Sequence, residues 1–368
     1  MTTVTAAFFP LDSRLALTEH SWSRQTIEHA LRLGVEIASF ERAATSFTAL
    51  TGVALSKSAL HRLAEEYGAA VVAAQAAEAR SMVEVPRRQE SNGEVVWRKR
   101  VEPDSDIMAV SSDGVLIHIR EEGWKEVKAV SVSAVSVSAV SVSAVSASAV
   151  THAGAAPEGE YPAAPDVVLH RHSYRAGLWD AATFAHQHWA EAVRRGVDRA
   201  QTVVCVSDGA AWIWAIVFMC FALRVEVLDF WHATQRLWTV ARQRFATEAE
   251  ATSWVAAQRA ALAQSRLRHV MHQVRQLYPR HHPLPDDVRQ AIGYLFHNRR
   301  RMDYAACRQA GYPIGSGTIE SACKTVVQAR MKQAGMRWSR PGAQAMLALR
   351  TLLLSDRWHE LQTLVPPS

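Results

Sequence analysis

The sequence predicts an α/β fold in which a mixed sheet follows an N-terminal helical unit and is interrupted by a long helical segment. Strand-like and helical runs alternate between residues 107 and 229 in the order βββαβαβ. One acidic residue lies inside the first strand-like run, and another ends the fourth. Residues 231–310 then carry helical patterns only. These three observations define the expected architecture.

Composition bounds the class of protein before any element is considered. The chain has 368 residues, of which 49% are apolar and 21% are charged, as is typical of globular proteins. The net charge of +6 indicates either a polyanionic partner or a solvated basic surface. No segment resembles a signal peptide, and the most apolar window, 212–223, is too short to span a membrane. We therefore expect a cytoplasmic protein without membrane contact.

The cysteine pattern argues against a disulfide framework or a zinc site. No CxxC motif is present, and no histidine cluster completes a metal-binding set. The thiols are expected to be reduced, as in a cytosolic protein. The four residues are Cys205, Cys220, Cys307 and Cys323.

Residues 1–83 are predicted to form a helical domain that resembles a helix-turn-helix. Apolar residues recur at spacings of three and four at Ala43, Ala44, Phe47 and Leu50. Thr51-Gly52 would end this helix, and Ser56 would cap a second one. The second helix would present three residues to DNA: Lys57, His61 and Arg62. Two amphipathic helices around a glycine are also common in all-α proteins, which is the alternative. A basic linker follows over 84–105.

The next region is β-rich and contains a repeat. Residues 129–150 read AVSVS with a period of five, whereas strand faces alternate with a period of two. One regular amphipathic strand therefore cannot hold the whole tract. We expect its first part to complete a hairpin and about 133–165 to form a flexible loop. The predicted strands are 107–120, 124–132, 166–173, 201–207 and 225–229. The predicted helices are 180–195, 210–222, 317–334 and 341–354, besides those within 231–310.

Three acids lie where a buried carboxylate has no evident structural role. Asp113 is inside the first strand, Asp208 ends the fourth, and Glu320 begins a late helix. Unpaired buried carboxylates are costly, but a divalent cation can neutralise several at once. Each acid alone is more often structural, because Asp-Gly is a common turn step and Glu320 suits a helix start.

The order βββαβαβ with acids in these places is the layout of the ribonuclease H fold. There the first and fourth strands are neighbours, which would place Asp113 beside Asp208. The catalytic core would comprise 106–230 and 311–368, with 231–310 as an all-helical insertion. Phosphodiester chemistry suits such a site, since two Mg²⁺ or Mn²⁺ ions about 3.5–4 Å apart can activate the nucleophile and stabilise the leaving oxygen.

Three longer strings carry a resemblance to a known family. Residues 207–214 read SDGAAWIW, 228–233 read LDFWHA, and 312–321 read YPIGSGTIES, followed by Arg330-Met-Lys332 and by 335–338, GMRW. They resemble motifs of bacterial insertion-sequence transposases of the ISKra type, which are DDE transposases. The resemblance covers roughly 105–355.

The resemblance implies a catalytic, metal-binding triad of Asp113, Asp208 and Glu320. It also implies a DNA transposase that cuts transposon ends and joins them to target DNA. Such an enzyme would act in the bacterial cytoplasm, associated with the nucleoid when bound to DNA. It would work as a homodimer or higher assembly in a synaptic complex.

Further residues are expected to support this site. Asp229-x-x-His232 resembles a motif near the active site, where His232 would contact a phosphate or a flipped base; alternatively, Asp229 simply caps the helix that follows. Gly209 permits close backbone approach, and Ser316 could cap the Glu320 helix. Four basic residues are expected to line a DNA groove, or to be merely solvated: Lys324, Arg330, Lys332 and Arg337.

Two other functions stay open at this point. A ribonuclease H-like nuclease or resolvase would need the same acids. A catalytically decayed, transposase-derived DNA-binding protein would retain the fold, and the AVSVS tract beside Asp113 keeps that alternative open.

Overall fold

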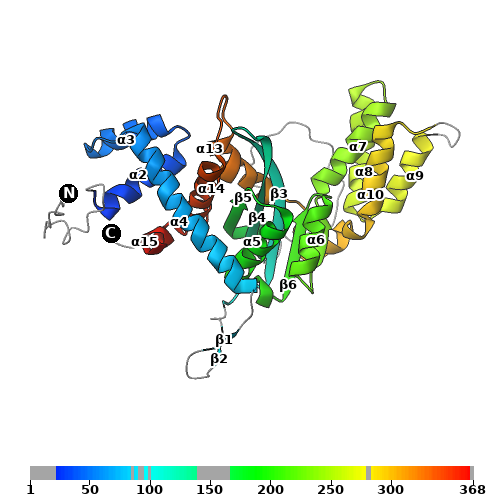
Figure 1. Cartoon of the computed structure of the whole chain (residues 1–368). Coiled ribbons are helices and arrows are strands. Elements are labelled where there is room, and N and C mark those ends of the chain that lie inside the picture. The colour runs from blue at the N-terminus through cyan, green and yellow to red at the C-terminus, as the bar shows by residue number, and fades with distance from the viewer. Residues whose placement is uncertain are drawn as a thin grey trace, which may run out of the picture.

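A computed structural model describes residues 22–83, 87–89, 95–97, 101–138, 166–278 and 283–364. Its centre is a five-stranded mixed sheet of order β5-β4-β3-β6-β7, which is 3-2-1-4-5 in the order of these strands along the chain (Figure 1). The first three strands are antiparallel neighbours, whereas β3, β6 and β7 are parallel. The strands are β3 (Ile107–Ile119), β4 (Gly123–Ser138), β5 (Asp166–Gly177), β6 (Thr202–Ser207) and β7 (Val225–Leu228). The predicted α/β class with a mixed sheet is confirmed.

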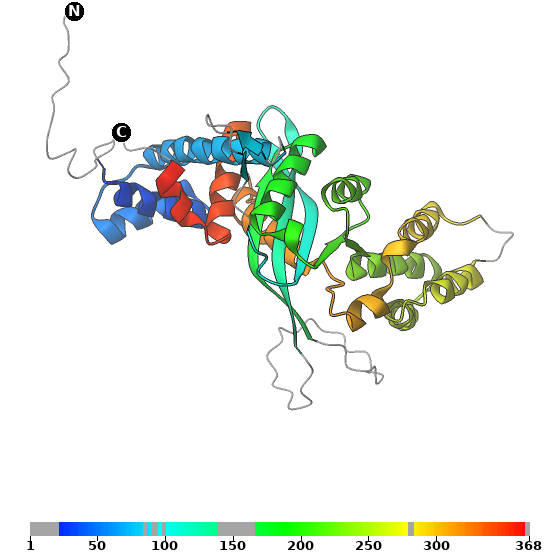
Figure 2. The same ribbon diagram turned by 90° about the horizontal axis from the view of Figure 1, so that it is seen from below.

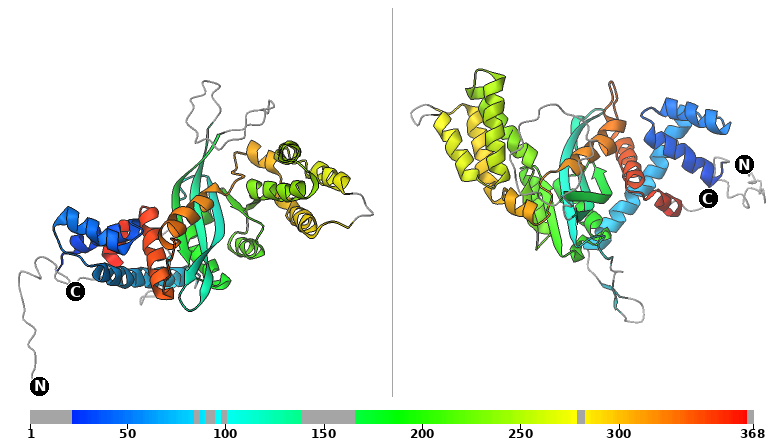
Figure 3. Two further views of the ribbon diagram at one scale, coloured as in Figure 1. Left: turned by 90° about the horizontal axis from the view of Figure 1, so that it is seen from above. Right: turned by 180° about the vertical axis from the view of Figure 1, so that it is seen from behind.

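Helices cover both faces of this sheet and extend beyond it at two ends. The N-terminal helices lie at one end of the molecule and α7–α10 at the other, with the sheet between them (Figures 2 and 3). The N-terminal helices are α2 (Arg24–Glu36), α3 (Phe40–Thr51) and α4 (Lys57–Val83). The sheet helices are α5 (Ala181–Arg194), α6 (Ala211–Cys220), α12 (Gly317–Ala322), α13 (Ala329–Met331), α14 (Arg340–Leu354) and α15 (Leu361–Leu364). The helices between β7 and α12 are α7 (Phe230–Arg244), α8 (Glu248–Ala263), α9 (Leu267–Leu277), α10 (Asp286–His297) and α11 (Tyr304–Gln309).

Short segments complete the architecture. The 3₁₀ turns are η1 (Val197–Arg199), η2 (Arg299–Arg301) and η4 (Trp358–Glu360), and a π-helical turn, η3 (Cys323–Gln328), lies between α12 and α13. A small hairpin pairs β1 (Arg87–Gln89) with β2 (Val95–Trp97). Among the described residues, no helix combines the length and the apolar character that a membrane crossing requires.

Alternate residues of β3 pack into two different cores. Ile117 and Ile119 pack with α4 and α14, whereas Met108 and Val110 pack with α5 and α6. Successive strand residues point to opposite faces, so burial on both faces requires an apolar strand. Asp113 is an exception in such a strand, and it lies on the face of Ile117 and Ile119.

The N-terminal unit confirms the predicted boundary between its last two helices. Gly52 ends α3 in the left-handed conformation with φ of 71°, and the Ser56 hydroxyl accepts a hydrogen bond from the Ala59 amide at 3.1 Å. The second helix, α4, has 27 residues and runs from the N-terminal helices to the sheet (Figure 2). Leu50, in the last turn of α3, is exposed rather than buried with Phe47.

The AVSVS tract extends strand β4 further than expected. The strand continues to Ser138, six residues beyond the predicted end at 132, and thus takes up part of the expected loop. Val130 and Val132 face the α5/α6 core, while Val135 is buried on the opposite face, so the change of face that the period of five requires does occur. Val137, the next valine on that opposite face, is 42% exposed, so burial on that face ends before the strand does. The neighbouring strand β5 adapts through a bulge at Arg171, where φ is 50°. The rest of the tract lies outside the described residues.

Candidate metal centre

The pairing of β3 with β6 brings Asp113 and Asp208 to the same level of the sheet. Val110 pairs with Cys205 in parallel register, and each aspartate lies three residues beyond its member of that pair. Asp208 directly follows the last residue of β6, and its negative charge acts on Asp113. The Ser207 hydroxyl accepts a hydrogen bond from the Ser112 amide at 3.1 Å, which joins the strands beside the acids.

Within the described residues, Asp113 forms no ion pair with arginine or lysine, although it is partly buried. Its Oδ1 accepts a hydrogen bond from the Gly114 amide at 2.7 Å, and the Cys323 thiol donates to its Oδ2 at 3.6 Å. Burial raises the pKa of Asp113, and the negative charge of Asp208 raises it further. Burial and the charge of Asp113 likewise raise the pKa of Cys323, which keeps the thiol protonated as a donor.

Asp229 is fully buried and has two roles. Its Oδ1 accepts a hydrogen bond from the His232 amide at 2.7 Å and lies 3.0 Å from His232 Nδ1, while its Oδ2 accepts bonds from Ser316. Capping of α7 by Asp229 is therefore confirmed, and the same residue orients His232. Although burial opposes it, these hydrogen bonds lower the pKa of Asp229. The hydrogen bond to Asp229, together with the charges of Asp208 and Glu320, raises the pKa of His232.

Glu320 completes a compact group with Asp229 and His232. One potential ligand atom from each of these three residues lies within 4.8 Å of the other two. Within the described ranges, no other set of three histidine, cysteine or acidic residues is as compact, so Asp113, Asp208 and Glu320 do not form such a group by themselves. Ser316 does not cap α12 as expected; its hydroxyl instead donates to Asp229 at 2.9 Å and lies 3.5 Å from Glu320.

A π-helical turn follows Glu320 within one turn of helix. The guanidinium of Arg350, on α14, donates hydrogen bonds to the carbonyl oxygens of Thr325 and Val326 in this turn and of Val35 at the end of α2. These bonds satisfy carbonyl groups that a widened turn leaves without regular helical partners. Arg350 thus connects the helix that carries Glu320 to the N-terminal helices.

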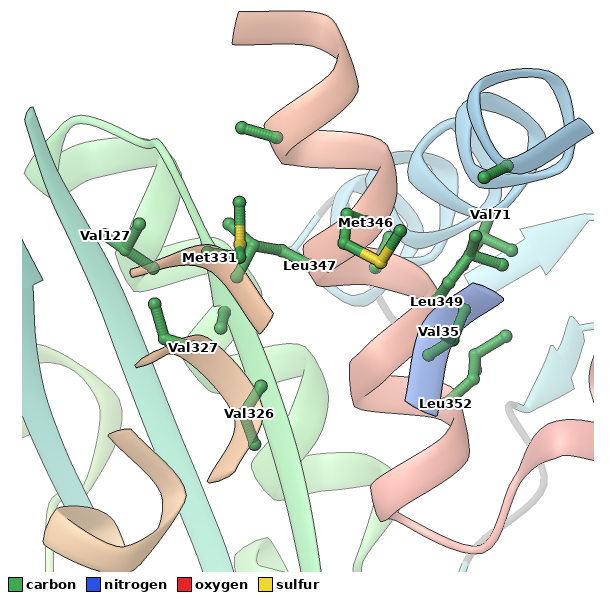
Figure 4. Packing of buried hydrophobic residues seen from close by; sticks show 14 of the residues in the cluster. Val35, Val71, Val127, Val326, Val327, Met331, Met346, Leu347, Leu349 and Leu352 are labelled. Carbon is green, nitrogen blue, oxygen red and sulfur yellow. The ribbon is translucent and has the colours of Figure 1, made fainter. Parts of the chain in front are cut away.

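Packing holds the same segment against the sheet. Val326, Val327 and Met331 lie between Val127 of β4 and the apolar residues of α14 (Figure 4). The segment is therefore anchored on both sides, which fixes the helix that begins with Glu320.

Arg330 is a correction to the predicted DNA-contacting set. Its side chain is buried with 1% exposure, its Nε donates to the Gly34 carbonyl at 3.1 Å, and its guanidinium lies 4.4 Å from the Phe40 ring centroid. The flanking aromatic rings and the carbonyl stabilise the buried charge, so it cannot reach a phosphate. Among the other predicted DNA contacts, His61 and His232 are half-buried, and five are exposed: Lys57, Arg62, Lys324, Lys332 and Arg337.

The helical segment between β7 and α12 reaches the site through Tyr294. The Gly209 amide donates to the Tyr294 hydroxyl at 3.2 Å, and a Cβ on Gly209 would lie 2.3 Å from the ring. Burial and the charge of Asp208 raise the pKa of Tyr294, and Arg236 lies 4.5 Å from its ring centroid. Neither Tyr294 nor Cys323 belongs to a recognisable sequence motif, so neither was predicted as a site residue; in the sequence, only Gly209 indicates a close approach of the backbone.

Comparisons with known proteins add no family assignment. A scan against protein-family models found no match, and a search of curated proteins found none either.

Proposed function

We propose that the protein is a DNA transposase that cuts transposon ends and transfers the freed strand into target DNA, using a ribonuclease H-like core. The observation that carries this proposal is the parallel register of β3 and β6, in which Asp113 and Asp208 each lie three residues beyond the paired Val110 and Cys205, together with the effect of the charge of Asp208 on Asp113. The strand order β5-β4-β3-β6-β7 and the helices inserted before Glu320 support it. In its closest alternatives, a nuclease or resolvase, the helical insertion has no evident role.

The side chains present suit Mg²⁺ or Mn²⁺. Within the described structure, none of Asp113, Asp208 and Glu320 forms an ion pair with arginine or lysine, and hard divalent cations prefer carboxylate oxygens. A cation would also remove the unfavourable burial of Asp113 beside Asp208. Asp113, Asp208 and Glu320 would hold two ions, which when bound supply activation of water or a 3′-hydroxyl and stabilisation of the leaving oxygen.

Three further residues would bind the DNA or hold the site in position: His232, Ser316 and Tyr294. His232 is held by Asp229 in an orientation and charge state suited to a DNA phosphate. Ser316 fixes Asp229 and approaches Glu320, so it connects the β7–α7 junction to the start of α12. Tyr294 accepts the hydrogen bond of Gly209 and thereby fixes the chain immediately after Asp208.

Strand cleavage and joining on the natural substrate test the proposal. The full chain would be incubated with DNA that carries the sequences flanking its own gene, with Mg²⁺ or with EDTA. Wild type should nick the ends and join them to target DNA only with Mg²⁺, and Asp208→Asn should bind the ends without cutting them.

Three other outcomes would contradict the proposal in different ways. Cleavage without any joined product would indicate a nuclease, and preference for a branched DNA junction a resolvase. Specific binding of the ends without cleavage in Mg²⁺ or Mn²⁺ would indicate a decayed DNA-binding protein.

A further inference from the structure

A basic hollow lies at the β7 edge of the sheet, away from Asp113, Asp208 and Glu320. Its volume is about 950 Å³, and its walls come from the start of β7, from η2 and from α11. Strand β7 is the last strand of the sheet, so among the described residues this edge has no further strand beside it. Four arginines line the hollow: Arg224, Arg299, Arg300 and Arg301.

Two of these arginines share one acidic partner, and two have none among the described residues. Glu226 forms ion pairs with Arg224 and Arg301, both at 2.6 Å. The other acid in the wall, Asp303, caps α11 and accepts a hydrogen bond from the Ser265 hydroxyl at 2.6 Å. Arg299 and Arg300 are exposed and, in the described part of the chain, form no ion pair. The hollow therefore presents two uncompensated guanidinium groups to an anion.

Aromatic rings beside the hollow favour a nucleic acid over a small anion. Phe296 is 57% exposed and lies 4.4 Å from the Arg299 guanidinium, measured to the ring centroid. Phe218 is 71% exposed and lies 5.1 Å from Arg224. Guanidinium groups beside open aromatic faces offer phosphate contacts and base stacking together, which is the combination that binds nucleic acid strands.

The hollow also lies at a distance from the candidate metal centre that a few nucleotides of one DNA strand could span. Val225 lines it, and β7 leads from there in four residues to Asp229. At about 3.3 Å per strand residue, this separation is about 13 Å. One strand of duplex DNA advances about 3.4 Å per nucleotide, so about four nucleotides cover the same distance.

We propose that this hollow binds the backbone of a DNA strand about four nucleotides away from the phosphate held at the metal centre. The spacing rests on the proposed function, whereas the binding of DNA by Arg299 and Arg300 does not. Because the contacts are to phosphates, they are independent of base sequence.

Equilibrium binding without metal tests the site directly. Fluorescein-labelled 20-nucleotide DNA, single- and double-stranded, would be titrated with the full chain in EDTA at several salt concentrations. For Arg299→Ala/Arg300→Ala, the slope of log K against log salt on duplex DNA should be shallower by about 1.8, which corresponds to about 60-fold weaker binding at 0.1 M salt and convergence with wild type near 1 M.

Two further variants control for net charge and folding. Arg171→Ala/Arg289→Ala removes the same charge from exposed arginines that are already paired with Asp104 and Asp286, and it should bind as wild type does. Arg299→Lys/Arg300→Lys keeps the charge and should restore most of the affinity. Thermal melting would verify that all variants are folded.

Several outcomes would overturn the assignment. Unchanged DNA affinity of Arg299→Ala/Arg300→Ala would overturn it. An equal loss of DNA affinity in Arg171→Ala/Arg289→Ala would also overturn it, because it would indicate a general effect of net charge. A loss of binding confined to RNA of the same sequence would contradict DNA as the occupant. If the arginine pair controls binding but wild type never cuts its ends, the proposed function fails while the binding site stands.

Discussion

Two groups of acidic residues differ in how the fold compensates their charge. Glu191 is fully buried, yet it lies 3.3 Å from Arg175 and 3.2 Å from Arg357. Although burial alone would raise it, these arginines lower the pKa of Glu191 to about 2. Asp113, by contrast, forms no ion pair with arginine or lysine in the described structure, and burial together with the charge of Asp208 raises its pKa more than His232 lowers it. A carboxylate with arginine partners already has its negative charge compensated, whereas a carboxylate without them can bind a metal cation.

The two groups also lie in different parts of the fold. The arginine-paired group joins α4, β5, α5 and the C-terminal segment; Glu78 of α4, for example, contacts Arg175 at 2.7 Å as well as Arg194. The candidate metal centre joins β3, β6, the start of α7 and α12. We infer that the first group stabilises the fold and that the second carries the chemistry.

The largest expected effect is the loss of activity at the unpaired group. Asp113→Asn should lower metal-dependent DNA cleavage by on the order of a thousandfold or more, because the ligand acts as part of one unit. Its free energy of unfolding should not fall, since the change removes a buried charge. Gel assays and urea denaturation measure the two effects. Asp106→Asn, an exposed acid immediately before the same strand, should change neither. A strongly destabilised Asp113→Asn would show that this acid is structural.

Removal of the paired charge should give the opposite pattern. Glu191→Gln should lower the free energy of unfolding by about 3–5 kcal/mol, because two arginines would be left without their buried partner. Urea denaturation at neutral pH measures this. Glu360→Gln, which loses one partly exposed pair with Arg194, should cost about 1 kcal/mol or less. If both variants lost the same free energy of unfolding, burial of the ion pair would not determine its contribution to stability.

A buried histidine with no charged partner provides an intermediate case. Burial lowers the pKa of His188 from 6.5 to about 4. Between pH 6.5 and 4 the unfolded chain therefore binds a proton at this residue and the folded chain does not. The free energy of unfolding should fall by about 3 kcal/mol as the pH is lowered over this range. Above pH 6.5 this contribution is fully present. Urea denaturation at several pH values tests the trend, and His188→Leu should flatten it; a variant with the same pH dependence as wild type would assign the effect to other groups.

The smallest effect should be stabilisation by metal at the unpaired group. Mn²⁺ at a hundred times its Kd should raise the free energy of unfolding of wild type by about 2.7 kcal/mol. The same addition should leave Asp113→Asn nearly unchanged and should stabilise Glu191→Gln as much as wild type. Thermal melting with and without Mn²⁺ gives the comparison. A shift of equal size in Asp113→Asn would place the bound ion elsewhere.

Local sequence patterns were sufficient for most elements of the fold. The apolar runs predicted β3 and β6, and the glycine and serine signals predicted the boundary between α3 and α4. They failed at the repeat, where pairing with a neighbouring strand decided the outcome. Strand β4 runs to Ser138 because it stays paired with β5 as far as Asp166.

The candidate site divides in the same way. The sequence by itself nominated Asp113, Asp208 and Glu320, since each lies in or next to an element that local patterns reveal. Only the tertiary structure brought Cys323 to Asp113, Tyr294 to Gly209 and buried Arg330 between aromatic rings. Periodicity and turn residues act over a few positions, whereas contacts between distant segments depend on how whole helices pack. For that reason the sequence alone could point to the acids, whereas only the fold could decide which acids have arginine partners.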